Sequence, residues 1–360
     1  MTAFAYDARC LEHDNGSMLI DERAIRWLSV PHYEGPERIA AAMSLLVASG
    51  ALGSLARLPS RLAERGELEL VHTPAHVDRV EAACGAGALS EIGEGARAGP
   101  GSWEPAMLAA GNVLAVTDAV LAGEQPNGLA LVRPPGHHAS AGTAMGFCLF
   151  NNVAIAARHA QRRQGIERIA IVDWDVHHGN GTETIFWEDP SVLFVSLHQD
   201  DLYPVGRGGA GDRGAGDGLG ATVNVPLPPG TGDEGYAYAF ERVVEPALRS
   251  FGPDLIIVSA GQDPAATDPL GRMCVTSGGF GALTSRALEL AAELCEGRLV
   301  VAQEGGYSVE HNALGILAIA EALAGLEPSL AADPLELDIP RGLRDFERDA
   351  VDAIADHSGA

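Results

Sequence analysis

"RIAIVDWDVHHGN", residues 168–180, decides between the fold classes open to this chain. It opens as a continuous apolar run and ends in carboxylates and imidazoles. A strand that is apolar on both faces is typical of a parallel sheet with helices on either side. Similar runs recur along the chain, and we expect strands over residues 67–72, 128–133, 168–176, 191–198, 222–227, 254–261 and 298–306.

Longer segments with helical spacing lie between most of these runs, over residues 36–49, 103–122, 151–164, 233–250, 279–296 and 309–325. This alternation predicts an α/β fold in which a mainly parallel sheet lies between layers of helices. We find no repeat or low-complexity linker in the first 325 residues, so we predict a single domain over residues 1–360. Residues 326–360 form a proline-containing tail and an acidic amphipathic helix, which could pack on the domain or on a second subunit.

Composition narrows the possible partners and location. The 360 residues carry a formal net charge of -25, which argues against nucleic acid because phosphate binding needs basic patches. We expect no membrane span and no signal peptide, and therefore a cytoplasmic protein. Five cysteines without a CxxC pair fit reduced thiols better than a disulfide framework.

Ligands of open parallel sheets bind at the carboxyl ends of the strands, and several of the predicted strands end in polar side chains. Asp173, Asp175 and His177 occupy alternate positions, so in an extended chain they point to one side. Asp263 follows the run 254–261. Two carboxylates and one imidazole would leave a Zn²⁺ ion with an open position for water or substrate. In the alternative interpretation Asp173 caps a turn and the histidines face water.

Two other strand ends carry candidate catalytic groups. His137 and His138 stand side by side in "RPPGHHA", where a surface turn with two histidines is an equally good interpretation of the pair alone. Tyr307 follows two glycines in "EGGY", and its phenol could stabilise an oxyanion beside a metal.

With these residues in place, the chain resembles the histone deacetylase family, in particular class II and the bacterial deacetylase-like amidohydrolases, which include acetylpolyamine amidohydrolases. The resemblance covers roughly residues 4 to 325 and rests on "YDARCLEHDNG", "GPERI", "RPPGHHA", "GFCLFNNVAIAARHA", "VDWDVHHGNGT", "VSLHQ", "DPLGRM" and "EGGY". It implies the arginase/deacetylase fold, with an eight-stranded, mainly parallel sheet between helical layers.

The resemblance also implies roles for individual positions. The zinc ligands match Asp175, His177 and Asp263, and the catalytic residues match His137, His138 and Tyr307. The structural K⁺ or Na⁺ sites match two groups: Asp173, Asp175, His177, Ser196 and Leu197, and then Phe186, Asp189 and Val192. The substrate tunnel matches Gly146, Phe147, Tyr203 and the rim acid Glu94, and the residues supporting the site match Asp173, Asn180 and Gln262.

We therefore expect a zinc-dependent amidohydrolase that hydrolyses the acyl amide of an acetyl-lysine, an acetylpolyamine or a related small amide. The alternative is a catalytically weak acyl-group sensor or scaffold that retains the fold. A binuclear manganese site of arginase type is disfavoured, because "SAGQDPAATDP" lacks paired D-x-D spacing. We also expect a homo-oligomer, a dimer or tetramer. The resemblance leaves open whether Gln262 and Pro264, which depart from the family pattern, alter specificity, and whether Fe²⁺ or Co²⁺ replaces Zn²⁺ in the cell.

Overall fold

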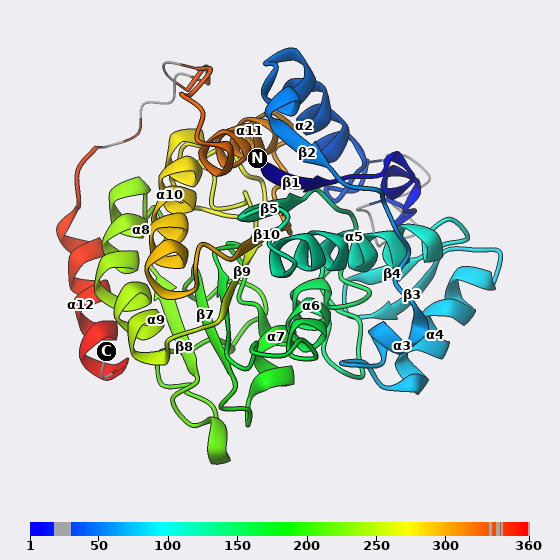
Figure 1. Ribbon diagram of the computed structural model, residues 1–360, viewed down its shortest axis with the longest axis horizontal. Coiled ribbons are helices and arrows are strands. Elements are labelled where there is room, and N and C mark those ends of the chain that lie inside the picture. Colours follow the sequence, from blue (N-terminus) through cyan, green and yellow to red (C-terminus); the bar gives the residue numbers. More distant parts are fainter. Residues whose placement is uncertain (18–29, 331–332, 336–338, 340, 359–360) are drawn as a thin grey trace.

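The computed structural model describes residues 1–17, 30–330, 333–335, 339 and 341–358. Its centre is one sheet of eight strands, and every neighbouring pair in it is parallel (Figure 1). The strand order is β2–β1–β5–β10–β9–β6–β7–β8. The strands are β1 (Thr2–Ala5), β2 (Leu55–Arg57), β5 (Asn127–Ala130), β6 (Ile169–Asp173), β7 (Val192–Gln199), β8 (Thr222–Leu227), β9 (Leu255–Ala260) and β10 (Leu299–Gln303). The predicted parallel α/β sheet is thus confirmed.

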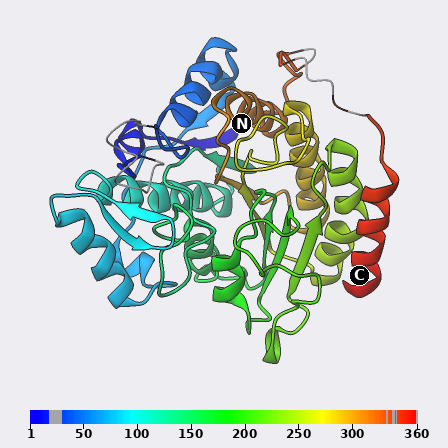
Figure 2. The same ribbon diagram turned by 180° about the vertical axis from the view of Figure 1, so that it is seen from behind.

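Helices cover both faces of this sheet, as the two opposite views show (Figures 1 and 2). Helices α5 (Trp103–Leu121) and α6 (Asn152–Ala160) pack on one face, and α10 (Ser277–Leu294) and α11 (Val309–Ala324) pack on the other. Successive side chains of a strand point to opposite faces. In β6, Ile169 and Ile171 therefore join the core under α5 and α6, whereas Ala170 and Val172 join the core under α10 and α11. Burial on both faces explains why these strands are apolar throughout.

Side-chain caps fix where several of these helices begin. The Asn151 side chain accepts the N–H of Ala154 at the start of α6, and Thr276 accepts the N–H of Gly279 at the start of α10. The other helices are α2 (Glu37–Ala48), α3 (Arg65–Leu68), α4 (Pro74–Gly85), α7 (Asn180–Phe186), α8 (Asp233–Ala239), α9 (Glu245–Phe251) and α12 (Asp345–Ser358). Strands β3 (Ser90–Gly93) and β4 (Ala96–Ala98) form a separate antiparallel pair.

The prediction of a strand over residues 67–72 is wrong. These residues hold the end of α3 and a turn, because Glu64 and Glu67 form a reciprocal capping box that starts a helix there. The helix predicted over residues 233–250 is divided into α8, a π-helical turn over Phe240–Val244, and α9.

The helix α5 is, by length and composition alone, apolar enough to cross a membrane, contrary to the expectation that no segment would be. However, 78% of the most apolar stretch of this helix is buried within the molecule, where the helix packs on β1, β5 and β10. An interior helix of an α/β protein has this composition because it is covered on nearly all sides.

The tail predicted at about residues 326–360 lies partly outside the described residues. Its helix α12, red in Figure 1, packs on β8, which is an edge strand of the sheet, and on α8. Glu347 accepts the N–H of Gly232 at 2.9 Å, and the hydroxyl of Tyr238 donates to Asp352 at 2.7 Å. Of the two arrangements left open by the sequence, the helix adopts the one in which it packs on its own chain.

Candidate active site

The candidate catalytic residues gather at the carboxyl ends of β5, β10, β9 and β6, four strands that are consecutive in the sheet. The His137–His138 pair follows β5, Tyr307 follows β10, Asp263 follows β9, and Asp175 and His177 follow β6. The carboxyl ends of parallel strands meet at one edge of a sheet, so segments far apart in sequence converge there.

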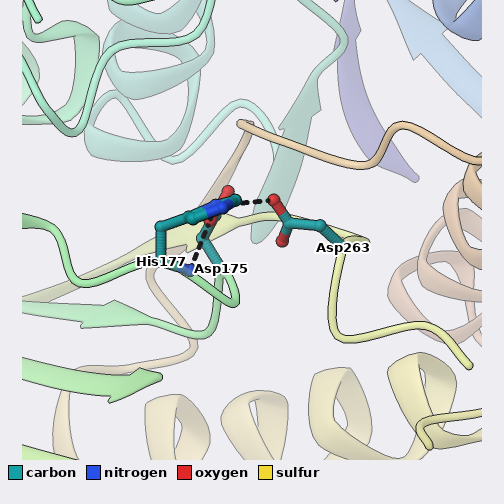
Figure 3. A group of neighbouring side chains, drawn as sticks. All are labelled: Asp175, His177 and Asp263. Atoms are coloured by element: carbon teal, nitrogen blue, oxygen red, sulfur yellow. Dashed lines mark hydrogen bonds and ion pairs between the residues drawn. The ribbon is translucent and has the colours of Figure 1, made fainter. Parts of the chain in front are cut away.

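Asp175, His177 and Asp263 form a compact group of possible metal ligands. Their donor atoms all lie within 4.8 Å of one another, and all three residues are buried. The Nδ1 atom of His177 lies 3.0 Å from Asp175 Oδ1 and 3.2 Å from Asp263 Oδ2 (Figure 3). Two carboxylate oxygens and an imidazole nitrogen facing one point make a donor set suited to Zn²⁺.

The surroundings of this group fit a bound cation. The backbone N–H of Val176 donates to Asp263 Oδ1 and that of Gly305 to Asp175 Oδ2, each at 2.8 Å. The buried Asp263 Oδ2 accepts no hydrogen bond from the described residues and has only the ion-pair contact with His177 Nδ1. Burial and the neighbouring Asp175 charge raise the pKa of Asp263 to about 8. A buried carboxylate pair of this kind is stabilised by a positive charge between the two groups.

His137 is held by Asp173. Its Nδ1 lies 2.9 Å from Asp173 Oδ2, and its Nε2 lies 3.7 Å from Asp175 Oδ1. Burial alone would lower the pKa of His137, but the charges of Asp175 and Asp173 outweigh it and raise the pKa well above its usual value. His137 is therefore the histidine of the pair that favours a positive charge.

His138 has the opposite character. Its Nδ1 lies 2.7 Å from Asn180 Oδ1, an atom that can only accept, so Nδ1 carries the proton and Nε2 is left as an acceptor. Burial, together with the positive charge of His137, lowers the pKa of His138 well below its usual value. The two adjacent rings, with centroids 4.1 Å apart, thus take different protonation states.

Tyr307 reaches the site from a turn that two glycines allow. A Cβ at Gly305 would collide with the carboxylates of Asp263 and Asp175, and Gly306 has φ +118°, which disfavours other residues. Arg38 donates to the carbonyl oxygens of Glu304 at 2.8 Å and Gly306 at 3.1 Å. Burial and the nearby Asp263 and Asp175 charges raise the pKa of Tyr307 well above 10, so the phenol remains a donor.

These side chains open onto a cavity of about 390 Å³. The cavity is lined by His138, His177 and Tyr307 and by all four residues predicted for the tunnel, and its full lining is Glu94, Gly95, His138, Gly146, Phe147, His177, Leu202, Tyr203, Leu270 and Tyr307. The ring of Tyr203 lies 5.2 Å from that of His138, and the ring of Phe147 lies 5.7 Å from that of Tyr307. An apolar cavity ending at a few polar groups is the usual form of a small-ligand site.

Gly146 lies in the cavity wall at a position that does not accommodate a side chain, and we predict that Gly146→Ala impairs activity. Its φ is +53°, and a Cβ there would collide with the ring of His138. Displacing a reacting group by about 1 Å can cost on the order of a hundredfold in rate. We expect kcat/KM to fall between about tenfold and a hundredfold while the metal content is unchanged.

Gly142→Ala is the matched control, because a Cβ at Gly142, in the same loop, would meet no atom within 4 Å. It should retain the activity of the unaltered chain. Equal activity of both alanine variants would show that the conformation of Gly146 does not matter.

The residues predicted for the monovalent-cation sites fall into two groups. Asp173 on β6 is paired in register with Ser196 on β7, next to Leu197 and to the Asp175 and His177 segment. In the second group, Asp189 donates its N–H to the carbonyl of Phe186 at 3.0 Å, just before Val192 begins β7. Whether cations bind there stays a prediction.

Gln262 lies under the site but outside the cavity lining. It is buried and donates from Nε2 to the carbonyl of Ala260 at 2.9 Å, while its N–H donates to the carbonyl of Gly305 at 3.1 Å. Sequence reasoning singled out neither Leu202 nor Leu270, which line the cavity, because apolar side chains there look like core residues. It also gave no role to Arg38 or Asp268, although both lie in motifs that carry the resemblance, "GPERI" and "DPLGRM".

Comparisons with known proteins agree with this geometry. A family model described as the histone deacetylase domain matches residues 32–323. A histone deacetylase-like amidohydrolase of Pseudomonas aeruginosa is 43% identical in an alignment of 367 positions, which covers 99% of this chain and 96% of the relative. A probable deacetylase of Archaeoglobus fulgidus is 42% identical, covering 85% of each chain. The human polyamine deacetylase HDAC10 is 43% identical over 81% of this chain and 44% of its own length.

A solved structure gives the same result for the fold. The crystal structure of the HDA15 HD domain superposes with a TM-score of 0.87 at 36% identity, covering 99% of this chain and 94% of the other. The family match and the superposition assign the chain the arginase/deacetylase fold and the class of the deacetylase hydrolases. The chain belongs to the histone deacetylase family, which is metal-dependent, and has a candidate metal site.

Proposed function

We propose that this chain is a zinc-dependent amidohydrolase that removes the acyl group from an acylated amine. The observation that carries the proposal is the group Asp175, His177 and Asp263 beside a cavity that also exposes His138 and Tyr307. Bound Zn²⁺ would act as a Lewis acid toward the amide carbonyl and would acidify a water. Names of the relatives, which include an amidohydrolase and a polyamine deacetylase, support the reaction class.

The chain's own groups have matching roles. His138, neutral and with a free Nε2, would accept a proton from water and return it to the leaving amine. His137, charged beside Asp173, would stabilise negative charge near the reacting atoms. The phenol of Tyr307 would donate a hydrogen bond to the oxyanion. Phe147 and Tyr203 would enclose the linear part of the substrate.

The resemblance to deacetylases extends the proposal to monovalent cations. We propose that K⁺ or Na⁺ binds near Asp173, Ser196 and Leu197, and a second ion near Phe186, Asp189 and Val192. The cytoplasmic location, the homo-oligomer, the single domain and the absence of nucleic-acid and membrane partners also stay predictions.

The proposal is tested by measuring metal content and turnover together. The purified chain should contain one zinc ion per chain and should deacetylate a fluorogenic acetyl-lysine peptide, acetylputrescine or both. A chelator should abolish turnover, and added Zn²⁺ should restore it. Zinc without turnover on any acylated amine would favour the sensor or scaffold. Turnover that survives complete metal removal would exclude metal-dependent hydrolysis.

A further inference from the structure

Asp268 ties together two loops that approach the cavity from different strands. It lies between β9 and α10 and is only 7% exposed. One carboxylate oxygen, Oδ2, accepts the N–H of Tyr307 at 2.6 Å and that of Ser308 at 3.1 Å. The other oxygen, Oδ1, accepts the N–H of Leu270 at 2.9 Å. A single buried side chain therefore fixes three backbone N–H groups.

The residues that Asp268 holds face the substrate cavity. Tyr307 supplies the phenol, and Leu270 forms part of the apolar wall. The turn before Tyr307 contains Gly305 and Gly306, which have more backbone freedom than other residues. Without an anchor after these glycines, the direction of the phenol would be poorly fixed. Arg38 holds the turn on the glycine side, and Asp268 holds it on the tyrosine side.

Burial and hydrogen bonding act in opposite directions on the carboxylate of Asp268. Burial raises the pKa of Asp268 to about 6, although the backbone N–H groups of Tyr307, Leu270 and Ser308 act in the opposite direction. An acid whose pKa is higher in the folded chain than in the unfolded chain binds more protons when folded. Folding stability from this group therefore falls as the pH rises from the unfolded pKa, about 4, to the folded value. The three backbone N–H groups favour the ionised carboxylate, which is the form that accepts all three hydrogen bonds.

We propose that Asp268 is a positioning residue that aims the phenol of Tyr307 and links it to the cavity wall at Leu270. It acts through the backbone of Tyr307 and does not itself line the cavity. This inference rests on the proposed amide hydrolysis, because it concerns the donor that serves the oxyanion in that reaction.

The test is a double-mutant cycle with Asp268→Asn and Tyr307→Phe, assayed on the acylated amine that the unaltered chain hydrolyses best. Asparagine has nearly the same shape, but its amide nitrogen cannot accept, so it cannot keep all three bonds. Asp268→Asn should lower kcat between about tenfold and a hundredfold, with a smaller change in KM and an unchanged metal content. In the Tyr307→Phe background the same change should cost less than about twofold, because residues that act as a unit are not additive.

Asp254→Asn is the matched control. Asp254 Oδ2 also accepts two backbone N–H groups, those of Glu167 at 2.9 Å and Arg168 at 2.8 Å, but outside the active site. It should leave kcat unchanged. A loss on Asp268→Asn that is equally large with and without the phenol, or that is accompanied by loss of metal, would overturn the proposal.

A second variant keeps the test decisive if Asp268→Asn does not fold. The exposed Thr267 bonds the Ser308 hydroxyl at 2.8 Å and so tethers the same turn. Thr267→Val should lower kcat by less than about tenfold, and only when the Tyr307 hydroxyl is present. An equal loss in the Tyr307→Phe background would overturn the proposal. If the unaltered chain hydrolyses no acylated amine, the proposed function fails, whereas an active chain with a fully active Asp268→Asn variant refutes this inference alone.

Discussion

Asp263→Asn is expected to lose bound metal and turnover together. Asp263 Oδ2 is the buried ligand atom without a hydrogen-bond partner among the described residues, and an amide in its place offers a neutral and weaker ligand. Mutations of groups that merely support a metal ligand cost tenfold to about a hundredfold in metal affinity or activity. Loss of the ligand itself should therefore lower kcat/KM by at least about a hundredfold. Metal analysis of the purified variant and initial rates on an acylated amine measure both effects.

The same carboxylate-to-amide change at Asp233 is the control, because Asp233 bonds Thr276 at the start of α10 and lies outside the group of possible ligands. Asp233→Asn should keep its metal. A fully active, metal-loaded Asp263→Asn variant would contradict the proposed ligand set.

Tyr307→Phe is expected to have the converse outcome, with metal retained and turnover lost. Only the hydroxyl is removed, and the ring contacts with Phe147 and His177 can persist. Removing one oxyanion donor costs on the order of a hundredfold to a thousandfold in kcat. We therefore expect kcat to fall by at least about a hundredfold, with unchanged metal content and a similar unfolding temperature.

Tyr238→Phe is the matched control for this variant. It removes a hydroxyl that donates to Asp352 on the C-terminal helix, outside the cavity lining. Full turnover by Tyr307→Phe would remove the phenol from the mechanism and leave the His137–His138 pair as the remaining acid–base candidates.

The sequence predicted most of the central sheet because parallel strands that are covered on both faces are apolar throughout. It missed β1 and β2, which are only four and three residues long, and it placed a strand where a capping box starts α3. Strands of three or four residues carry little pattern of their own, whether at the edge of the sheet, as β2 is, or between two other strands, as β1 is.

Strand ends also predicted much of the candidate site. Asp175, His177 and Asp263 do converge, as their positions after β6 and β9 require. The cavity wall at Leu202 and Leu270 could not be predicted in the same way, because an apolar side chain in a loop looks the same whether it faces substrate or core. The anchor at Asp268 depends on which backbone N–H groups are nearby, and that information exists only in three dimensions.

The most direct test of the central claim is X-ray diffraction from crystals of active protein, measured on both sides of the zinc absorption edge. The proposal predicts one strong anomalous peak within bonding distance of Asp175 Oδ, His177 Nδ1 and Asp263 Oδ2, at the base of the cavity that Tyr307 lines. Active crystals with no metal peak at these three side chains, or with the zinc peak elsewhere in the molecule, would contradict it.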